Sequence, residues 1–389
     1  MANRIAILGS TGSIGCNALE VIEHLGGDYR AVALGANRNV AKLMEQAGRV
    51  RPSAIGVGDE ALAGEVEAKS RELGARVYVG GGGMAEMACR EDVDTVLAAM
   101  VGAAGVGPVL AGVKSGKKIA LANKEALVVA GSVVVPEARK CGAQILPVDS
   151  EHSAIFQAML AGRLDEVKRV ILTASGGPFR KATAAEIESA TLKDALNHPT
   201  WRMGNKITID SATMFNKALE IIEACWLFDI PADKIQVVIH PESVIHSMVE
   251  YVDGSVMAQL SPPDMRTPIQ YALTYPQRRQ GIGRKLDLSR GFNWTFEPPD
   301  MQRFPALRLG YEAAERRGTA GAILNAANEV AVEAFINGKI RFGGICRIVE
   351  LTIRSCRVQE QPSMDDLLEA DRQARAVAAE LVRDDKVKG

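Results

Sequence analysis

The stretch Arg4-Ile-Ala-Ile-Leu-Gly9-Ser-Thr-Gly12-Ser-Ile-Gly15 decides the fold of the first part of the chain. Its apolar run, residues 5–8, is typical of a buried strand, and the residues after Gly12 can begin a helix. Glycines at such a junction permit a tight turn and let the backbone approach a pyrophosphate at the helix N-terminus. An ordinary glycine-rich turn is the alternative, but the order of strand, glycines and helix favours a dinucleotide-binding site.

Apolar runs that alternate with helix-like stretches continue as far as residue 148. Fully apolar strands belong to parallel sheets that helices cover on both faces. The pattern therefore predicts an α/β fold, with a Rossmann-like, doubly wound parallel sheet in an N-terminal domain. We expect further strands at residues 31–34, 54–57, 96–100, 118–122 and 144–148.

The second strand and the loop after it indicate which dinucleotide binds. An NAD site would place an Asp or Glu here to accept hydrogen bonds from the ribose 2′-hydroxyl. This segment, Ala31-Val-Ala-Leu-Gly-Ala-Asn37-Arg38-Asn39, contains no acid and one cation. Arg38 can pair with a 2′-phosphate, although a solvated loop arginine is the alternative. The segment favours NADP.

Beyond Asp149 the pattern changes to that of an α+β domain. Asp253-Gly254 is typical of a two-residue hairpin turn between the last two strands. Thr183 and Glu186 form a capping box that can begin a short helix. We expect the strands of this region at residues 170–173, 206–209, 235–239, 244–251 and 255–260.

The last part of the chain is predicted to be a linker followed by a helical bundle. Residues 277–305 contain many Arg, Gly and Pro residues and little periodicity. Helices are expected at residues 306–317, 320–337, 345–357 and 365–383, the last with Ser363 as its cap. The apolar face of that helix comprises Leu367, Ala370, Ala374, Val377 and Leu381. We predict an NADPH-binding domain (1–149), a catalytic domain (150–276), a linker (277–305) and a C-terminal helical domain (306–389).

Composition limits the classes of function. A net charge of −1 gives no field for nucleic acid or an anionic membrane. The six cysteines are far apart and favour reduced thiols in a cytoplasm. The N-terminus lacks the apolar region of a signal peptide. The longest uncharged stretch, residues 95–113, approaches membrane-spanning length but is interrupted by glycines and Pro108. We expect a cytoplasmic protein without a membrane segment.

Three carboxylates are candidates for a metal site. Asp149 and Glu151 follow the last strand of the predicted parallel sheet, where open α/β sheets bind ligands, and can point to the same side of an extended segment. Glu220 shares a helix face with Asn216 and Lys217. Carboxylate oxygens suit Mg²⁺ or Mn²⁺ better than zinc. Capping and surface roles are the alternatives. We expect one metal site between the first two domains.

Two clusters have the residue types of a phosphate site. Ser175-Gly-Gly-Pro178 is a small-residue loop after a strand, which can present backbone N–H groups to an anion. Ser211, Asn216 and Lys217 supply a hydroxyl, an amide and a cation at and near the start of a long helix, where the dipole favours an anion. A tight turn for Ser175 and a helix cap for Ser211 are the alternatives.

The loop Asn197-His198-Pro-Thr-Trp201-Arg-Met-Gly204 lies between these clusters in the sequence. An aromatic-bearing loop with a glycine hinge can serve as a lid over a reactive site. A structural histidine and a core tryptophan are the alternatives. The remaining histidines show no metal-ligand spacing and are expected to be structural; they are His24, His152, His240 and His246.

Taken together, these motifs resemble the family of 1-deoxy-D-xylulose 5-phosphate reductoisomerases. The matches occur in order over nearly the whole chain, and the loop at residues 36–39 is the segment that varies within the family. The matching motifs are residues 9–15, Leu121-Ala-Asn123-Lys124-Glu125, Pro147-Val-Asp149-Ser150-Glu151-His152, Ser175-Gly-Gly-Pro-Phe179, His198-Pro-Thr-Trp201, residues 210–220, His240-Pro-Glu-Ser-Val-Ile-His246-Ser-Met248, Pro263-Asp-Met265-Arg-Thr-Pro268 and Leu324-Asn-Ala-Ala-Asn-Glu329.

The resemblance implies a homodimer that converts 1-deoxy-D-xylulose 5-phosphate and NADPH into 2-C-methyl-D-erythritol 4-phosphate, an isoprenoid precursor. It implies that Asp149, Glu151 and Glu220 hold Mn²⁺, Mg²⁺ or Co²⁺. The implied catalytic residues are these three with Lys124 and His198. The implied substrate contacts are Lys124, Ser150, Glu151, Ser175, His198, Trp201, Ser211, Asn216, Lys217 and Glu220. The implied cofactor contacts are Gly9, Thr11, Gly12, Ser13, Ile14, Gly15, Asn37, Arg38, Asn39, Asn123, Glu125 and Gly204.

Other classes of protein share parts of this pattern. Another NADP-dependent sugar-phosphate oxidoreductase or epimerase would share the glycine turn, but the short-chain class needs Tyr-x-x-x-Lys, and none of the six tyrosines has a lysine four residues later. A semialdehyde dehydrogenase would need a nucleophilic cysteine. A nucleotide sensor without catalysis would not need carboxylates beside a phosphate site.

Overall fold

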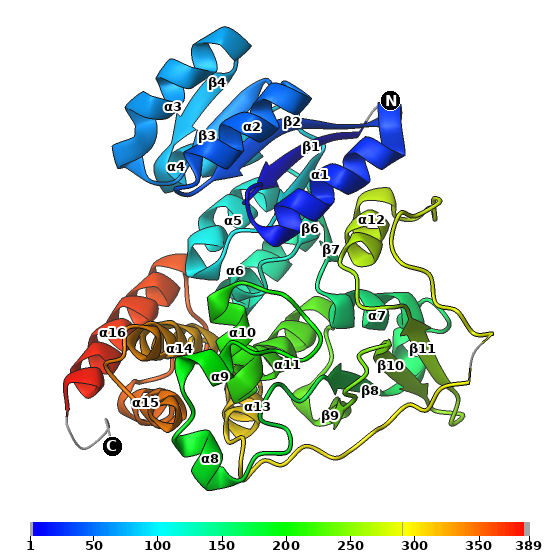
Figure 1. Ribbon diagram of the computed structural model, residues 1–389, viewed down its shortest axis with the longest axis vertical. Coiled ribbons are helices and arrows are strands. Elements are labelled where there is room, and N and C mark those ends of the chain that lie inside the picture. The colour runs from blue at the N-terminus through cyan, green and yellow to red at the C-terminus, as the bar shows by residue number, and fades with distance from the viewer. Residues whose placement is uncertain (1–2, 290, 385–389) are drawn as a thin grey trace. The chain divides into compact units, whose positions relative to one another are not determined.

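The computed structural model describes residues 3–289 and 291–384, which form two compact units (Figure 1). Unit 1 comprises the described residues up to Ala126, together with 134–153 and 264–284. Unit 2 comprises residues 127–133 and 154–263 and the described residues from Lys285 onward. The sequence suggests domain boundaries after residues 149, 276 and 305, and these boundaries stay a prediction.

Unit 1 contains a seven-stranded parallel sheet, coloured blue to cyan in Figure 1. Its order is β4-β3-β2-β1-β5-β6-β7, so the direction of strand addition reverses between β1 and β5. This arrangement confirms the predicted Rossmann-like, doubly wound sheet. The strands are β1 (Asn3–Leu8), β2 (Tyr29–Ala36), β3 (Ala54–Val57), β4 (Arg76–Val79), β5 (Thr95–Ala98), β6 (Lys118–Leu121) and β7 (Gln144–Pro147).

All of these strands except β4 match apolar runs that were predicted to be strands. The uncharged stretch at residues 95–113 folds as β5, a 3₁₀ turn at Gly102–Gly105 and α5. No helix among the described residues combines the length and the apolar character needed to cross a membrane. The helices that lie wholly or partly in unit 1 are α1 (Ser13–Leu25), α2 (Val40–Val50), α3 (Ala63–Ser70), α4 (Gly80–Ala88), α5 (Val106–Lys114), α6 (Glu125–Cys141), α7 (Ser150–Met159) and α12 (Arg266–Thr274).

The sheet of unit 2 is mixed, with the order β11-β10-β8-β9. Strand β8 is antiparallel to β10 and parallel to β9, which confirms the predicted α+β character. The hairpin turn lies at the predicted place, but the Tyr251 N–H bonds to the Ser255 carbonyl, so the turn has three residues rather than two. Gly254 ends it with φ of 87°. The strands are β8 (Val167–Ala174), β9 (Ile235–Ile239), β10 (Ile245–Tyr251) and β11 (Val256–Leu260).

The strand predicted at residues 206–209 is wrong, because these residues lie in helix α10 (Asn205–Thr213). The alternation of Ile207 and Ile209 is too short to distinguish the two periods, and Thr208 is buried together with Ile209. The predicted long helix is also divided: Met214 has φ of 65° and separates α10 from α11 (Phe215–Phe228).

The four C-terminal helices that the sequence predicts are present. They are α13 (Ala306–Arg316), α14 (Ala320–Ile336), α15 (Phe342–Ser355) and α16 (Met364–Arg383), and two short helices precede α10, α8 (Ala184–Glu188) and α9 (Leu192–Ala195). The predicted capping box at Thr183 and the predicted cap at Ser363 are confirmed. Leu367 and Ala374 of the predicted apolar face are buried, but towards the end of α16 the buried residues are Ala378 and Val382, one position beyond the predicted Val377 and Leu381.

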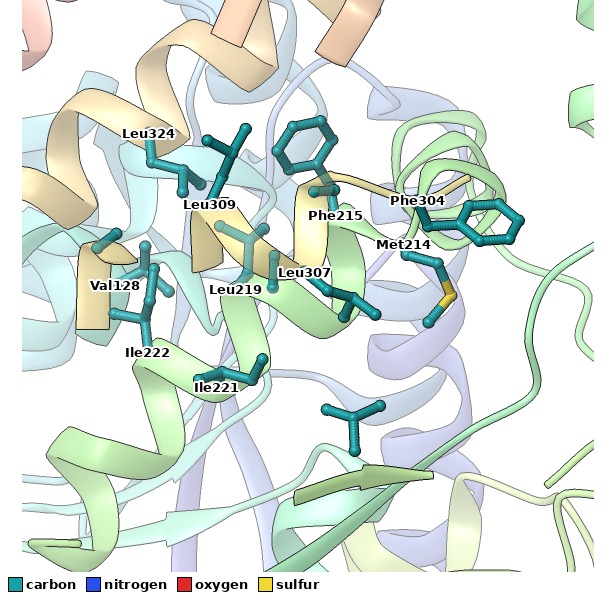
Figure 2. Close-up of a cluster of buried hydrophobic side chains, with 14 of the residues drawn as sticks. Val128, Met214, Phe215, Leu219, Ile221, Ile222, Phe304, Leu307, Leu309 and Leu324 are labelled. Atoms are coloured by element: carbon teal, nitrogen blue, oxygen red, sulfur yellow. The ribbon is translucent and has the colours of Figure 1, made fainter. Parts of the chain in front are cut away.

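Helix α11 lies at the centre of the core of unit 2 (Figure 2). Its apolar side chains Phe215, Leu219 and Ile222 are almost fully buried and pack among residues of α13 and α14. The helices approach closely at Gly310 of α13, where a Cβ atom would lie 2.7 Å from the Ala218 Cα. Because α11 is enclosed in this way, the polar side chains at its start have fixed positions.

Candidate active site residues

The glycine turn after β1 requires its glycines. Gly9 has φ of 99°, and a Cβ atom there would lie 2.3 Å from the Ala99 carbonyl oxygen after β5. A Cβ atom on Gly15 would lie 2.4 Å from the Gly9 carbonyl oxygen. The next residues, Thr11, Gly12, Ser13 and Ile14, are exposed or half-buried at the start of α1. The turn therefore lies between β1 and β5, where strand order reverses and where open α/β sheets bind ligands.

The three residues predicted after β2 are exposed at the same edge of the sheet. The Arg38 Nε atom pairs with an Asp59 carboxylate oxygen at 2.9 Å, and the Arg38 side chain is 78% exposed. Asn39 caps α2 by accepting a hydrogen bond from the Lys42 N–H at 3.2 Å. Asn37 packs against Gly58, where a Cβ atom would meet its Oδ1. A cofactor contact for this loop stays a prediction.

Asn123 and Glu125 are buried after β6 and hold the neighbouring loop after β5. Asn123 donates hydrogen bonds to the Gly102 carbonyl at 3.0 Å and to the Glu125 carboxylate at 2.9 Å. That carboxylate also accepts a bond from the Gly102 N–H at 3.3 Å. Contact of Asn123 and Glu125 with the cofactor stays a prediction, and their bonds to Gly102 were not expected from the sequence.

Lys124 and Asp149 form a buried ion pair at the ends of the neighbouring strands β6 and β7. The Nζ atom lies 2.5 Å from the carboxylate, and the side chains are 6% and 13% exposed. Burial opposes ionisation of Asp149, but Lys124 and His152 outweigh it and hold the pKa of this carboxyl well below its ordinary value. Asp149 is therefore an anion that carries its own counter-charge.

The segment after Asp149 is helical rather than extended, contrary to the prediction. Glu151 lies in the first turn of α7, and its N–H donates to the Asp149 carboxylate at 3.3 Å. Asp149 thus has the capping role that was the alternative, without losing its place beside Lys124. Ser150 donates a hydrogen bond to the Glu151 carboxylate at 2.5 Å.

In unit 2, the loop after β8 lies against the end of α10. Gly176 and Gly177 have φ of 83° and 65°. A Cβ atom on Gly177 would lie 2.7 Å from the Ser211 carbonyl oxygen, so only glycine permits this approach. The loop that carries Ser175 therefore contacts α10 at Ser211, and a shared phosphate site for the two serines stays a prediction. Ser211, however, lies in the last turn of α10, not at the start of a long helix.

His198 joins this cluster through Ser175. Its Nε2 atom lies 3.0 Å from the Ser175 Oγ atom, and its Nδ1 atom accepts the N–H groups of Thr200 and Trp201 at 3.1 and 2.9 Å. With Nδ1 an acceptor, the proton of the neutral ring is on Nε2, which donates to Ser175. Burial lowers the pKa of His198 to about 4. The ring is neutral at physiological pH.

Asn216, Lys217 and Glu220 share one face of α11, as predicted. The Glu220 carboxylate accepts hydrogen bonds from the Asn216 amide and the Lys217 ammonium, each at 2.5 Å. Lys217 is 3% exposed and Glu220 is fully buried. One amide, of Asn216, and one ammonium group, of Lys217, lie in the first turn of α11, where the helix dipole adds a favourable field for an anion.

The loop that contains Trp201 is less enclosed than these clusters. Trp201 is half-buried, and its ring lies 6.4 Å from the ring of His246. Gly204 begins α10, and its carbonyl accepts a hydrogen bond from Thr208. His246 itself bonds to Ser261 at 3.0 and 3.1 Å. The role of the loop as a lid stays a prediction.

The other histidines have structural partners. His240 is buried, stacks on Phe296 with ring centres 4.7 Å apart, and bonds to the Thr295 carbonyl at 3.0 Å. His24 bonds to the Gln280 carbonyl at 2.9 Å. These contacts agree with the structural roles expected from the sequence.

Three family models match the chain in succession. The model described as 1-deoxy-D-xylulose 5-phosphate reductoisomerase matches residues 5–131, and its C-terminal domain model matches residues 145–228. The model described as DXP reductoisomerase C-terminal domain matches residues 260–377. Among curated relatives named 1-deoxy-D-xylulose 5-phosphate reductoisomerase, the protein of Pelodictyon phaeoclathratiforme is 50% identical over 97% of this chain and 99% of its own. That of Rhodospirillum centenum is 51% identical over 97% and 94%.

Solved structures agree with the sequence comparison. A crystal structure of DOX-P reductoisomerase in complex with NADPH, fosmidomycin and magnesium superposes with a TM-score of 0.94 at 42% identity, covering 98% of both chains. The 1-deoxy-D-xylulose 5-phosphate reductoisomerase of Zymomonas mobilis in complex with NADPH gives a TM-score of 0.91 at 43% identity, covering 98% of this chain and 99% of its own. The chain belongs to the 1-deoxy-D-xylulose 5-phosphate reductoisomerase family.

Proposed function

We propose that this protein uses NADPH and a divalent metal ion to convert 1-deoxy-D-xylulose 5-phosphate into 2-C-methyl-D-erythritol 4-phosphate. The observation that carries the proposal is the match over 97% of the chain to a reductoisomerase that is identical at half of the aligned positions. A crystal structure at 42% identity contains NADPH, fosmidomycin and magnesium, the ligand classes that the proposal requires.

Asp149, Glu151 and Glu220 are the proposed metal ligands, for Mg²⁺ or Mn²⁺ and with Co²⁺ as a further candidate. The donor set fits a hard divalent cation, because all three offer carboxylate oxygens. Two of these carboxylates are paired with a lysine ammonium, Asp149 with Lys124 and Glu220 with Lys217. Buried carboxylates need such positive charge, which a bound cation also supplies. When bound, the metal acts as a Lewis acid on neighbouring substrate oxygens.

The substrate phosphate is proposed to bind at the cluster in unit 2. Ser175, Ser211, Asn216 and Lys217 offer hydroxyl, amide and ammonium donors, and His198 donates to Ser175. Binding energy from a phosphate remote from the reacting carbons can orient those carbons. Lys124, Ser150 and Glu151 are proposed to contact the substrate backbone, with Trp201 covering it and excluding water.

NADPH is proposed to bind along the ligand-binding edge of the unit 1 sheet. The residues proposed to contact it are those of the glycine turn (Gly9, Thr11, Gly12, Ser13, Ile14, Gly15), those after β2 (Asn37, Arg38, Asn39) and Asn123, Glu125 and Gly204. The glycines, which a Cβ atom would disrupt, favour a close approach of the pyrophosphate. We further propose that the protein is a cytoplasmic homodimer. Sedimentation of the purified protein tests the dimeric state.

A coupled requirement tests the function directly. NADPH oxidation followed at about 340 nm should depend on both 1-deoxy-D-xylulose 5-phosphate and added Mg²⁺ or Mn²⁺. The product should be identified as 2-C-methyl-D-erythritol 4-phosphate by mass spectrometry against a standard. Oxidation with another sugar phosphate and none with this substrate would instead indicate a different NADP-dependent sugar-phosphate oxidoreductase.

A further inference from the structure

A buried hydrogen bond joins the C-terminal helices to the helix that carries Ser211. Asn328 of α14 donates from Nδ2 to the Asp210 Oδ1 atom of α10 at 2.9 Å. Asn328 is fully buried and Asp210 is 2% exposed. Hydrogen bonds to a charged acceptor that water does not reach are among the stronger ones in proteins. The two residues are 118 positions apart, so the bond connects two segments that are distant in the sequence.

Asp210 uses its second carboxylate oxygen on its own helix. The Lys206 Nζ atom lies 2.5 Å from Oδ2, one turn earlier on α10. Lys206 is near the start of α10, just after the loop that contains Trp201, and Asp210 directly precedes Ser211. One oxygen is thus bound to α14 and the other to Lys206 of the same helix, so the bond from Asn328 is the one that ties Asp210 to another element.

The buried amide of Asn328 lowers the stability of the folded state, so packing alone does not explain why this position is polar. Its Oδ1 atom is buried and has no hydrogen-bond partner among residues 3–289 and 291–384. An unpaired buried acceptor destabilises the folded state, and a leucine of similar volume would avoid that loss. The hydrogen bond to Asp210 is the interaction that only a polar side chain supplies at this position.

The position of α10 determines the geometry of the phosphate cluster. The Ser211 carbonyl lies against Gly177, in the loop that presents Ser175. After Met214, which has φ of 65°, the chain continues as α11, which carries Asn216 and Lys217. A small rotation of α10 would therefore move Ser211 relative to the other phosphate donors.

We infer that Asn328 is a positioning residue for the substrate phosphate: through Asp210 it holds α10 so that Ser211 faces the other donors. The inference rests on the proposed function. It makes the affinity for the phosphate-bearing substrate depend on a residue of the C-terminal helices. NADPH affinity should depend on it much less, because all the proposed cofactor contacts except Gly204 belong to unit 1.

The chain offers a matched control on the same helix. Asn325 lies one turn earlier on α14, is fully buried, and also has an unpartnered Oδ1 among the described residues. Its Nδ2 atom donates to Glu329 of the same helix at 3.0 Å, so it reaches α10 only indirectly, through the charge interaction of Glu329 with Lys206. Replacing either asparagine by leucine changes volume and polarity equally, but only Asn328→Leu removes the bond to α10.

The experiment compares Asn328→Leu with Asn325→Leu in the full-length protein. For Asn328→Leu we expect KM for 1-deoxy-D-xylulose 5-phosphate to rise about tenfold, as for loss of a hydrogen bond to a charged group. The inhibition constant of inorganic phosphate should rise in parallel, while KM for NADPH stays within about twofold. Asn325→Leu should leave all three within about twofold, whatever its melting temperature.

Equal effects of the two leucine variants on substrate KM, or an effect of Asn328→Leu on kcat alone, would overturn the inference. If Asn328→Leu does not fold, the pair Asn328→Ala and Asn325→Ala decides by the same readouts. The unaltered enzyme separates the two proposals. If the unaltered enzyme does not turn over 1-deoxy-D-xylulose 5-phosphate, the proposed function itself is wrong. If it does, and the two leucine variants have the same substrate KM, only the role assigned to Asn328 is wrong.

Discussion

At the scale of single residues, His198 shows how a half-buried ring can be held in one protonation state. Two backbone N–H groups point at Nδ1, and the Ser175 hydroxyl lies at Nε2. An imidazolium would place a second N–H against the two backbone donors. The pKa of about 4 follows from this burial. His198 is thus a hydrogen-bond donor of fixed direction.

We predict that the His198 ring titrates with a midpoint near pH 4, measured by NMR with His198→Asn to assign the resonance. Because the folded pKa is below the ordinary 6.5, the unfolded chain takes up a proton between these values that the folded chain does not. The contribution to stability is therefore complete above pH 6.5 and is lost as the pH falls through about 4. A midpoint near 6.5 would contradict the burial of the ring.

Arg38 gives a second residue-scale prediction, for cofactor preference. Arg38→Ala should raise KM for NADPH about tenfold and change KM for NADH little, since only NADPH carries the 2′-phosphate. Arg30→Ala, an exposed arginine at the opposite end of the same strand, is the control. Equal efficiency of the unaltered enzyme with both cofactors would refute the role assigned to Arg38.

At the scale of elements, the glycine turns depend on contacts that no side chain could make. We predict that Gly15→Ala weakens NADPH binding severely, because its Cβ atom would lie 2.4 Å from the Gly9 carbonyl and from the Ser10 Cα. Gly48→Ala is the control: it lies within α2 with no atom near its Cβ position, and should stabilise the protein by up to about 1 kcal/mol. Equal cofactor affinity in the two variants, measured by fluorescence titration, would contradict this.

Most of the strands and helices, but not all, could be predicted from the sequence. Six of the seven parallel strands follow from apolar runs, and the capping boxes identify two helix starts. Strand β4 could not be predicted, since it has four residues and begins with an exposed arginine. The division between α10 and α11 could not either, because a methionine with φ of 65° is set by tertiary contacts and has no sequence signal.

The candidate site was predictable where residue type determines the chemistry. The shared face of Asn216, Lys217 and Glu220 follows from helical spacing. The pairing of Lys124 with Asp149 required the order of strands β6 and β7, and the tautomer of His198 required backbone positions. Such contacts depend on which segments meet in space, which local periodicity does not contain.

At the scale of the whole molecule, the proposed metal ligands come from both compact units. We predict that Glu220→Gln, which keeps shape and loses charge, weakens Mn²⁺ binding and lowers kcat at least about a hundredfold. NADPH affinity, measured by titration, should stay unchanged because the glycine turn is in unit 1. Normal turnover by this variant would refute the assignment of Glu220.

An inhibitor gives an independent measurement of the same proposal. A hydroxamate that bears a phosphonate should inhibit, with its two oxygens on the metal and its anion among the phosphate donors. Its affinity should fall when metal is removed by chelation. Equal affinity for metal-free enzyme would mean that the proposed ligands hold no metal in the inhibited state.

Helix α12 has a consequence for the order in which the protein can fold during synthesis. It packs on α1, β6 and β7. Asn3 of β1 donates a hydrogen bond to the Leu273 carbonyl, and Lys118 of β6 donates one to the Tyr275 carbonyl. Yet more than 100 residues of unit 2 precede it in the chain. As domains form while the chain leaves the ribosome, the nucleotide-binding unit cannot be completed until nearly three quarters of the protein has emerged. The unit that begins first is therefore completed only after more than 100 residues of the other unit have been synthesised.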